Sequence, residues 1–103
     1  MFYTFNQNNS GGGFDHDPAM GIGATVIIEA DSAEQANKRA VEIGLYFKGV
    51  RDGHDCECCG DRWHECRDDE GTETPERYGM PVNPGNEFWG IPVYIHYLDG
   101  TFK

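Results

Sequence analysis

All four cysteines of this 103-residue chain fall within one short segment, HDCECCGDRWHEC, at residues 54–66. Cys56 and Cys59 form a C-x-x-C pair followed by Gly60, which is the arrangement of a zinc knuckle. Its tight turn brings two thiolates onto one ion, and the glycine allows the positive φ that the turn tends to need. A closed structural site needs two further ligands, and the local candidates are Cys66, His64, His54 and Cys58. Because Cys58 lies between the knuckle ligands, we expect the other cysteine and one of the histidines to complete the site.

Two other cysteine chemistries fit the segment less well than zinc. Acidic residues flank the thiols and should raise a thiol pKa, which argues against a thioredoxin-like nucleophile; they are Asp55, Glu57, Asp61 and Glu65. A Cys–His hydrolase also needs an orienting third group and an oxyanion element, and the sequence identifies neither. We therefore expect a loop stabilised by structural zinc, without enzymatic activity.

Arg62 and Trp63 follow the cysteine pair and form a second candidate site. A guanidinium beside an indole can offer a fork for a phosphate and a stacking plane for a base. A loop rich in Asn and Gly near the N-terminus could cradle an anion with its backbone N–H groups. The candidate ligand-binding residues are Asn8, Asn9, Ser10, Gly11, Gly12, Arg62 and Trp63. The alternative is that Trp63 anchors the core of its loop while Arg62 pairs with Asp61 or Asp68.

The net charge of −10 is concentrated in the part of the chain that holds the cysteines. Residues 52–76 contain ten acids and two bases, whereas residues 77–103 are neutral. Such a field repels nucleic-acid backbones and attracts cations or basic protein surfaces, so we expect no generic binding of DNA or RNA. A solvated acidic loop that only maintains solubility is the alternative interpretation.

The regular elements that must position these residues have clear local signals. Aromatic residues alternate with polar ones in MFYTFNQ (1–7), and ATVIIEA (24–30) is a continuous apolar run typical of a central strand. Residues 31–49 predict a helix with a Ser32–Gln35 capping box and a stop at Gly49, or earlier at Gly44. Its sheet-facing residues are Ala36, Ala40, Ile43 and Phe47. The C-terminal segment VYIHYLDGTFK predicts a hairpin around the Asp-Gly pair.

This order of elements predicts an α+β fold: a small, mainly antiparallel sheet with one packed helix and an inserted Cys-rich, zinc-binding loop. The length predicts a single domain over residues 1–103. Its parts are residues 1–50 (strand, Gly-rich loop, strand and helix), residues 51–76 (acidic Cys-rich module) and residues 77–103 (loop and C-terminal hairpin). The N-terminus has no signal-peptide pattern, and no run of eighteen apolar residues occurs, so we expect a soluble cytoplasmic protein with no membrane partner.

Three stretches, MFYTFNQNNSGG, VIIEADSAEQAN…GLYF and DCECCGDRW, resemble a family of short proteins encoded by tailed bacteriophages. The resemblance covers most of the chain up to ERYGMPV. It implies a phage accessory protein that acts in the cytoplasm of a host bacterium. The family core CxCCGxRW maps onto Cys56, Cys58, Cys59, Gly60, Arg62 and Trp63, and leaves Cys66 and His64 outside it.

Two functional hypotheses follow, and both include a structural zinc ion. In the first, a homo-oligomer interferes with host defence by binding and sequestering a small anionic nucleotide signal through Arg62, Trp63 and the Gly-rich loop. In the second, the acidic segment is a zinc-stabilised protein-protein interaction module that inhibits a host protein. The Arg-Trp pair and the loop favour sequestration, whereas the net charge favours the interaction module.

Overall fold

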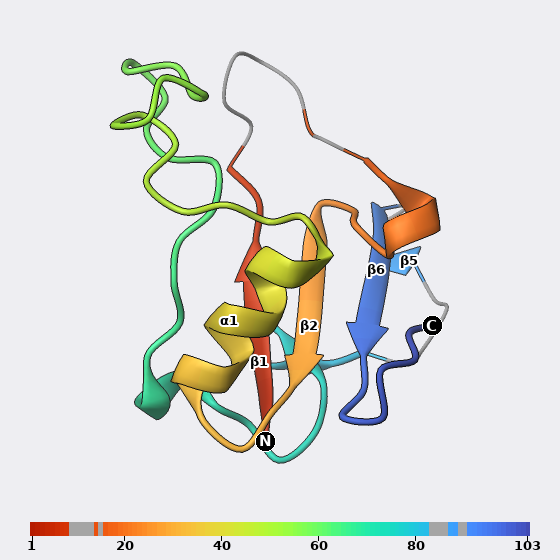
Figure 1. Ribbon diagram of the computed structural model, residues 1–103. Helices are drawn as coiled ribbons and strands as arrows, with labels where there is room; N and C mark the ends of the chain where they lie inside the picture. Colours follow the sequence, from red (N-terminus) through yellow and green to blue (C-terminus); the bar gives the residue numbers. More distant parts are fainter. Residues whose placement is uncertain (9–13, 15, 83–86, 89–90) are drawn as a thin grey trace.

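A computed structural model describes residues 1–8, 14, 16–82, 87–88 and 91–103 (Figure 1). Its elements in chain order are β1 (Phe2–Asn6), η2 (Pro18–Met20), β2 (Thr25–Glu29), α1 (Ala33–Ile43), η3 (Asp68–Glu70), β3 (Glu76–Arg77), β4 (Met80–Pro81), β5 (Glu87–Phe88) and β6 (Ile91–His96). The predicted α+β fold, with one α-helix on a mostly antiparallel sheet, is confirmed for these residues. None of their helices is long and apolar enough to span a membrane.

Within the described part of the chain, the main sheet has four strands in the order β1-β2-β6-β5. The outer pairs β1/β2 and β5/β6 are antiparallel, and the central pair β2/β6 is parallel. The apolar run in β2 is therefore a central strand, as its composition predicts. Residues 25–28 of this strand are almost completely buried, because both faces of the sheet are covered.

Helix α1 begins and ends at residues with clear capping roles. The Ser32 hydroxyl accepts a hydrogen bond from the Gln35 N–H at 3.2 Å, and the Gln35 side chain accepts one from the Asp31 N–H at 2.6 Å. At the other end Gly44 has a φ of 121°, which favours glycine. The earlier of the two predicted stops is thus correct, and the helix does not continue to Gly49. The buried residues of its sheet-facing side are Ala33, Ala36, Ala40 and Ile43.

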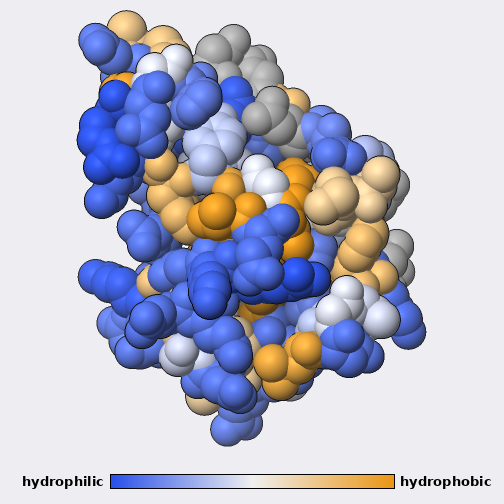
Figure 2. All heavy atoms as spheres, viewed as in Figure 1, coloured by the Kyte–Doolittle hydropathy of each residue, from blue (hydrophilic) through white to orange (hydrophobic). Residues whose placement is uncertain are grey.

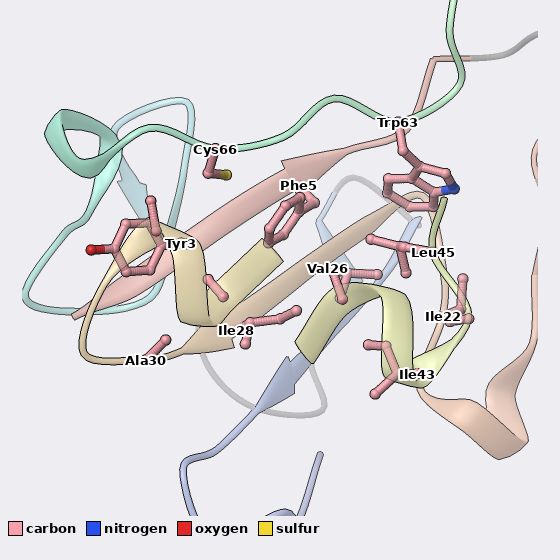
Figure 3. Close-up of a cluster of buried hydrophobic side chains, with 13 residues drawn as sticks. Tyr3, Phe5, Ile22, Val26, Ile28, Ala30, Ile43, Leu45, Trp63 and Cys66 are labelled. Carbon is pink, nitrogen blue, oxygen red and sulfur yellow. The ribbon is translucent and has the colours of Figure 1, made fainter. Parts of the chain in front are cut away.

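A hydrophobic core lies on each face of the sheet. On the helix side, Tyr3 and Phe5 of β1 pack with Val26 and Ile28 of β2, with α1, and with two residues of the loop segment, Trp63 and Cys66 (Figure 3). On the opposite side the core residues are Ile27, Val82, Val93 and Ile95. The Cys-rich loop therefore contributes side chains to the main core.

The C-terminal hairpin forms around the Asp-Gly pair, as predicted. Ile95 and Lys103 exchange backbone hydrogen bonds of 2.9 and 3.0 Å, and Gly100 has a φ of 91° in the turn. The return strand places Phe102 against the ring of His96, with 5.0 Å between ring centroids. His96 is buried, and its Nε2 lies 2.8 Å from the carbonyl oxygen of Gly21, while its Nδ1 has no hydrogen-bond partner among the described residues.

Candidate functional site

The C-x-x-C-G turn is formed in the structure. The carbonyl oxygen of Cys56 accepts hydrogen bonds from the N–H groups of Cys59 (3.2 Å) and Gly60 (3.0 Å), and Gly60 has the expected positive φ of 85°. Backbone N–H groups of Cys59 and Cys58 also hydrogen-bond the Cys56 thiolate. All three cysteines are exposed. We call Cys56, Cys58 and Cys59 the cysteine knuckle; Figure 1 shows its segment, in green, projecting away from the sheet.

The environment of Cys56 differs from the sequence-based expectation. The hydrogen bonds from Cys59 and Cys58 stabilise the thiolate and lower the pKa of Cys56, whereas the neighbouring acids predict a raised pKa. Two of those acids are engaged elsewhere. The Asp55 side chain is buried beside Arg62, and the Asp61 carboxylate accepts a hydrogen bond from the N–H of Val50 at 3.0 Å.

The end of β1 holds the knuckle in place through Asn8. The Asn8 side chain donates hydrogen bonds to the carbonyl oxygens of Cys59 (2.6 Å) and Asp61 (3.4 Å). The backbone N–H of Asn8 donates a third hydrogen bond, to the carbonyl oxygen of Arg62 (2.8 Å). Asn8 is thus a positioning residue for the loop. The other predicted residues of the Gly-rich loop, Asn9, Ser10, Gly11 and Gly12, lie outside the described residues.

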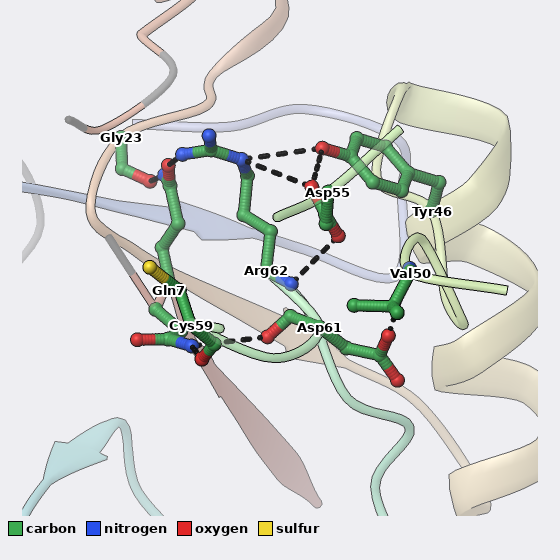
Figure 4. A network of polar contacts seen from close by, with 9 residues as sticks. Gln7, Gly23, Tyr46, Val50, Asp55, Cys59, Asp61 and Arg62 are labelled. Carbon is green, nitrogen blue, oxygen red and sulfur yellow. Dashed lines mark hydrogen bonds and ion pairs between the residues drawn. The ribbon is translucent and has the colours of Figure 1, made fainter. Parts of the chain in front are cut away.

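Arg62 is the centre of a network that ties the loop to the sheet and to the residues after α1 (Figure 4). Its Nη1 donates to Gln7 Oε1 at 2.7 Å, its Nε donates to the Tyr46 hydroxyl at 3.2 Å, and its Nε lies 3.7 Å from Asp55 Oδ1. The side chain of Arg62 is 11% exposed and that of Asp55 is 0% exposed. The sequence-based alternative that Arg62 pairs with Asp61 or Asp68 is therefore wrong. The carboxylate beside its guanidinium is the buried one of Asp55.

Asp55 binds two further groups in this network. Its carboxylate accepts hydrogen bonds from the Tyr46 hydroxyl and from the backbone N–H of Arg62, both at 2.8 Å. Burial, together with the hydrogen bond to Asp55, raises the pKa of Tyr46. A β-carbon at Gly49 would lie 2.6 Å from Asp55 Cγ, so only glycine fits here without displacing the carboxylate. The sequence pattern does not predict that Asp55 and Tyr46 are partners. They meet only because the chain turns back at residues 49–55.

The predicted presentation of Arg62 and Trp63 to a ligand is wrong. Trp63 is 2% exposed and packs in the helix-side core, because the chain after the knuckle returns along the sheet. Its ring has no free face on which a base could stack. The alternative interpretation of Trp63 as a core anchor is the correct one, although it anchors the main core of the molecule.

The predicted completion of a closed zinc site by Cys66 is also wrong. Cys66 is 7% exposed in the main core, and its thiol donates a hydrogen bond to the carbonyl oxygen of Thr4 at 3.3 Å. Burial raises its pKa to about 12, which disfavours the thiolate that a metal requires. His64 is exposed. Among the described residues, no three or more His, Cys, Asp or Glu side chains are grouped to hold a metal ion.

Comparison with known proteins places the chain in a family. One family model matches residues 1–103, and its description is "Domain of unknown function (DUF7296)". The chain belongs to the DUF7296 family. No curated protein and no solved structure matches it.

The DUF7296 chain carries an excess of exposed acids in the segment that also holds the knuckle. Within residues 52–76, the exposed carboxylates are Asp52, Glu57, Glu65, Asp68, Asp69, Glu70 and Glu73. Arg67 is the exposed base of this segment, and it lies 3.6 Å from both Asp69 and Glu70. The other base, Arg62, is mostly covered and pairs with the buried Asp55. Seven exposed carboxylates therefore stand against one exposed base on the surface of this segment.

A groove of about 590 Å³ runs between α1 and the chain at residues 65–68 of the DUF7296 fold. Its lining residues are Ala33, Glu34, Asn37, Lys38, Val41, Phe47, Glu65, Cys66, Arg67 and Asp68. Asp68 holds this segment against the helix, because its carboxylate accepts a hydrogen bond from the N–H of Ala33 at 2.9 Å. Figure 2 shows a largely hydrophilic face in which hydrophobic residues gather beside the helix. The groove thus combines three acids and two bases, Lys38 and Arg67, with apolar surface.

Proposed function

We propose that this DUF7296 chain is a non-enzymatic binding module that receives a basic segment of a partner protein. The observation that carries the proposal is the surplus of exposed carboxylates over exposed bases in residues 52–76. An acidic patch of this kind steers basic partners toward it and disfavours acidic ones. This choice develops the second of the two sequence-based hypotheses.

The groove beside α1 gives the proposed partner a place to bind. Glu34 and Glu65 contribute carboxylates to its lining, and the Val41 side chain is 56% exposed within it. A segment that alternates Lys or Arg with apolar residues would pair its charges with the glutamates and cover Val41. Asp68 adds negative charge to the groove, and its carboxylate also accepts a hydrogen bond from the N–H of Ala33 at the N-terminus of α1.

Sequestration of a nucleotide signal stays a prediction that the described geometry does not favour. Arg62 already binds Gln7, Tyr46 and Asp55, and Trp63 is buried, so neither offers the expected phosphate fork or stacking plane. A protein partner requires neither of them. The resemblance to tailed-phage proteins leads us to propose that this partner belongs to a bacterial host and is met in its cytoplasm.

A defined peptide tests the groove directly. We expect a fluorescently labelled peptide in which Lys and Leu alternate, so that an extended chain carries its charges on one side and its apolar groups on the other, to bind in an anisotropy titration, and more weakly as ionic strength increases. Glu65→Lys should weaken binding roughly three- to tenfold, since it reverses a charge at the groove. Val41→Ser should weaken it as well, because the apolar contact is lost.

Glu57→Lys is the matched control, because it makes the same charge change at an exposed glutamate outside the groove lining. It should weaken peptide binding less than Glu65→Lys does. Equal effects of the two variants, or an unchanged affinity in Val41→Ser, would show that the groove is not the binding site. In host lysate, a partner that is captured by the wild type and Glu57→Lys but lost with Glu65→Lys identifies the target.

A further inference from the structure

The cysteine knuckle has the geometry of one half of a thiolate metal site. Its turn places Cys56 and Cys59 side by side, with Gly60 in the positive-φ conformation that the turn needs. Backbone N–H groups point at the Cys56 sulfur, and hydrogen bonds of this kind orient and support a metal ligand. Asn8 holds this turn in place, because its side-chain NH₂ donates a hydrogen bond to the carbonyl oxygen of Cys59 at 2.6 Å.

Among the described residues, no further ligands are grouped with Cys56 and Cys59 to complete such a site. Structural zinc is held by four ligands, mainly sulfur and nitrogen. All the cysteines and histidines of the chain lie among the described residues, and these residues contain no group of three or more metal-ligating side chains. Cys66, the expected third ligand, is buried against Thr4. The exposed knuckle is therefore a half-site that is open to another molecule.

We propose that two copies of this chain share one zinc ion, each contributing Cys56 and Cys59 to a tetrahedral four-thiolate site. A second copy supplies the two missing thiolates in the same geometry, as a two-fold symmetric contact requires. The knuckle projects away from the sheet and all its thiols are exposed, so two copies can bring their knuckles together without opening either core. The acidic segments repel each other in this arrangement, so the zinc-linked dimer should form more readily at higher ionic strength.

Zinc titration of the reduced, full-length protein tests this proposal. We expect binding to end at one zinc ion per two chains, and light scattering should show a monomer becoming a dimer over the same titration. A chelator should return the monomer. Co²⁺ in place of zinc should give the absorption bands of a tetrahedral thiolate site.

Variants of the knuckle identify the ligands. Cys56→Ser and Cys59→Ser should each weaken zinc binding by more than about a hundredfold, since loss of an outer-shell partner alone costs about 10–100-fold. Cys58→Ser is the matched control and should keep both zinc and the dimer. All three thiols are exposed, so thermal unfolding in the absence of zinc should be the same for these variants and the wild type.

Several results would overturn the proposal. One zinc ion per monomer would mean that the chain completes its own site, and no zinc binding would mean that the half-site is not used. Loss of zinc in Cys58→Ser would assign a different set of ligands. A dimer that a reducing agent dissolves and a chelator leaves intact would be a disulfide-linked dimer.

Discussion

Replacing Asp55 with Asn tests whether the buried network of Arg62 stabilises the fold. The Asp55 side chain is 0% exposed, and it accepts two hydrogen bonds of 2.8 Å while lying 3.7 Å from the Arg62 guanidinium. The amide of Asp55→Asn keeps one acceptor oxygen and turns an NH₂ group toward donors. Arg62 then lacks its buried counter-charge.

The expected loss follows from these contacts. A hydrogen bond to a charged group contributes about 1.5–3 kcal/mol. Removing one partner of a buried ion pair costs about 3–5 kcal/mol, because the remaining charge stays buried. A change of about 1 kcal/mol moves Tm by roughly 4–8 °C in a domain of nearly this size, so we expect Asp55→Asn to lower Tm by at least about 12 °C. Tryptophan fluorescence can follow the unfolding, because Trp63 is buried in the native state.

Asp52→Asn is the matched control for this experiment. Asp52 lies 2.9 Å from Arg51, closer than Asp55 lies to Arg62, but both partners are exposed. Water screens such a pair, so its removal should leave Tm almost unchanged.

A double variant separates the ion pair from its surroundings. Combining Asp55→Asn with Arg62→Met should cost less than the sum of the single changes, because the second change removes the guanidinium charge that Asp55 otherwise balances. The reasoning is refuted if the free energy of unfolding of Asp55→Asn lies within about 0.5 kcal/mol of the wild-type value, because surface substitutions usually have effects of that size. Additive effects in the double variant would also refute it.

Three further predictions concern other buried or strained groups. Gly49→Ala should destabilise the fold by about 1–3 kcal/mol in urea unfolding, because the added methyl overlaps Asp55, and a smaller effect would mean that the carboxylate moves away freely. Burial lowers the pKa of His96 from its usual value of 6.5, so the unfolded state takes up a proton first as the pH falls. The stability that the neutral, buried His96 contributes to the fold is therefore complete above pH 6.5 and is lost progressively as the pH falls toward the pKa of His96 in the folded state. The variant His96→Gln should remove this part of the pH dependence of Tm. An unchanged dependence of Tm on pH would contradict the prediction. In the reduced native protein a thiol reagent should modify three cysteines rapidly and Cys66 only on unfolding, whereas equally fast modification of all four would place Cys66 outside the core.

The local elements of the fold could be predicted because their signals are local. The helix follows from its capping residues and alanine spacing, and the hairpin follows from its Asp-Gly turn. The parallel pairing of β2 with β6 has no such signal, since it joins two segments that are far apart in the chain. Fold class was therefore accessible from the sequence, while the strand order was not.

The candidate site could be predicted only as far as its own turn. The C-x-x-C-G spacing specifies the turn between Cys56 and Gly60, because each of its hydrogen bonds connects near neighbours. The position of Cys66 depends on where the chain runs after that turn, and here it runs into the core beside Thr4. The same return path buries Trp63, so a residue that resembles a ligand platform in the sequence is a packing residue in the fold.

The parallel contact between β2 and β6 also determines when the sheet can be completed. Thr25 pairs with Val93, so one edge of β2 is filled only by the last part of the chain. Contacts of such long sequence separation slow folding, because a large loop must close before they form. During synthesis β1, β2 and α1 leave the ribosome first, and the open edge of β2 is then available to strands of other chains. We expect chains truncated before residue 91 to aggregate rather than to persist as a smaller folded unit.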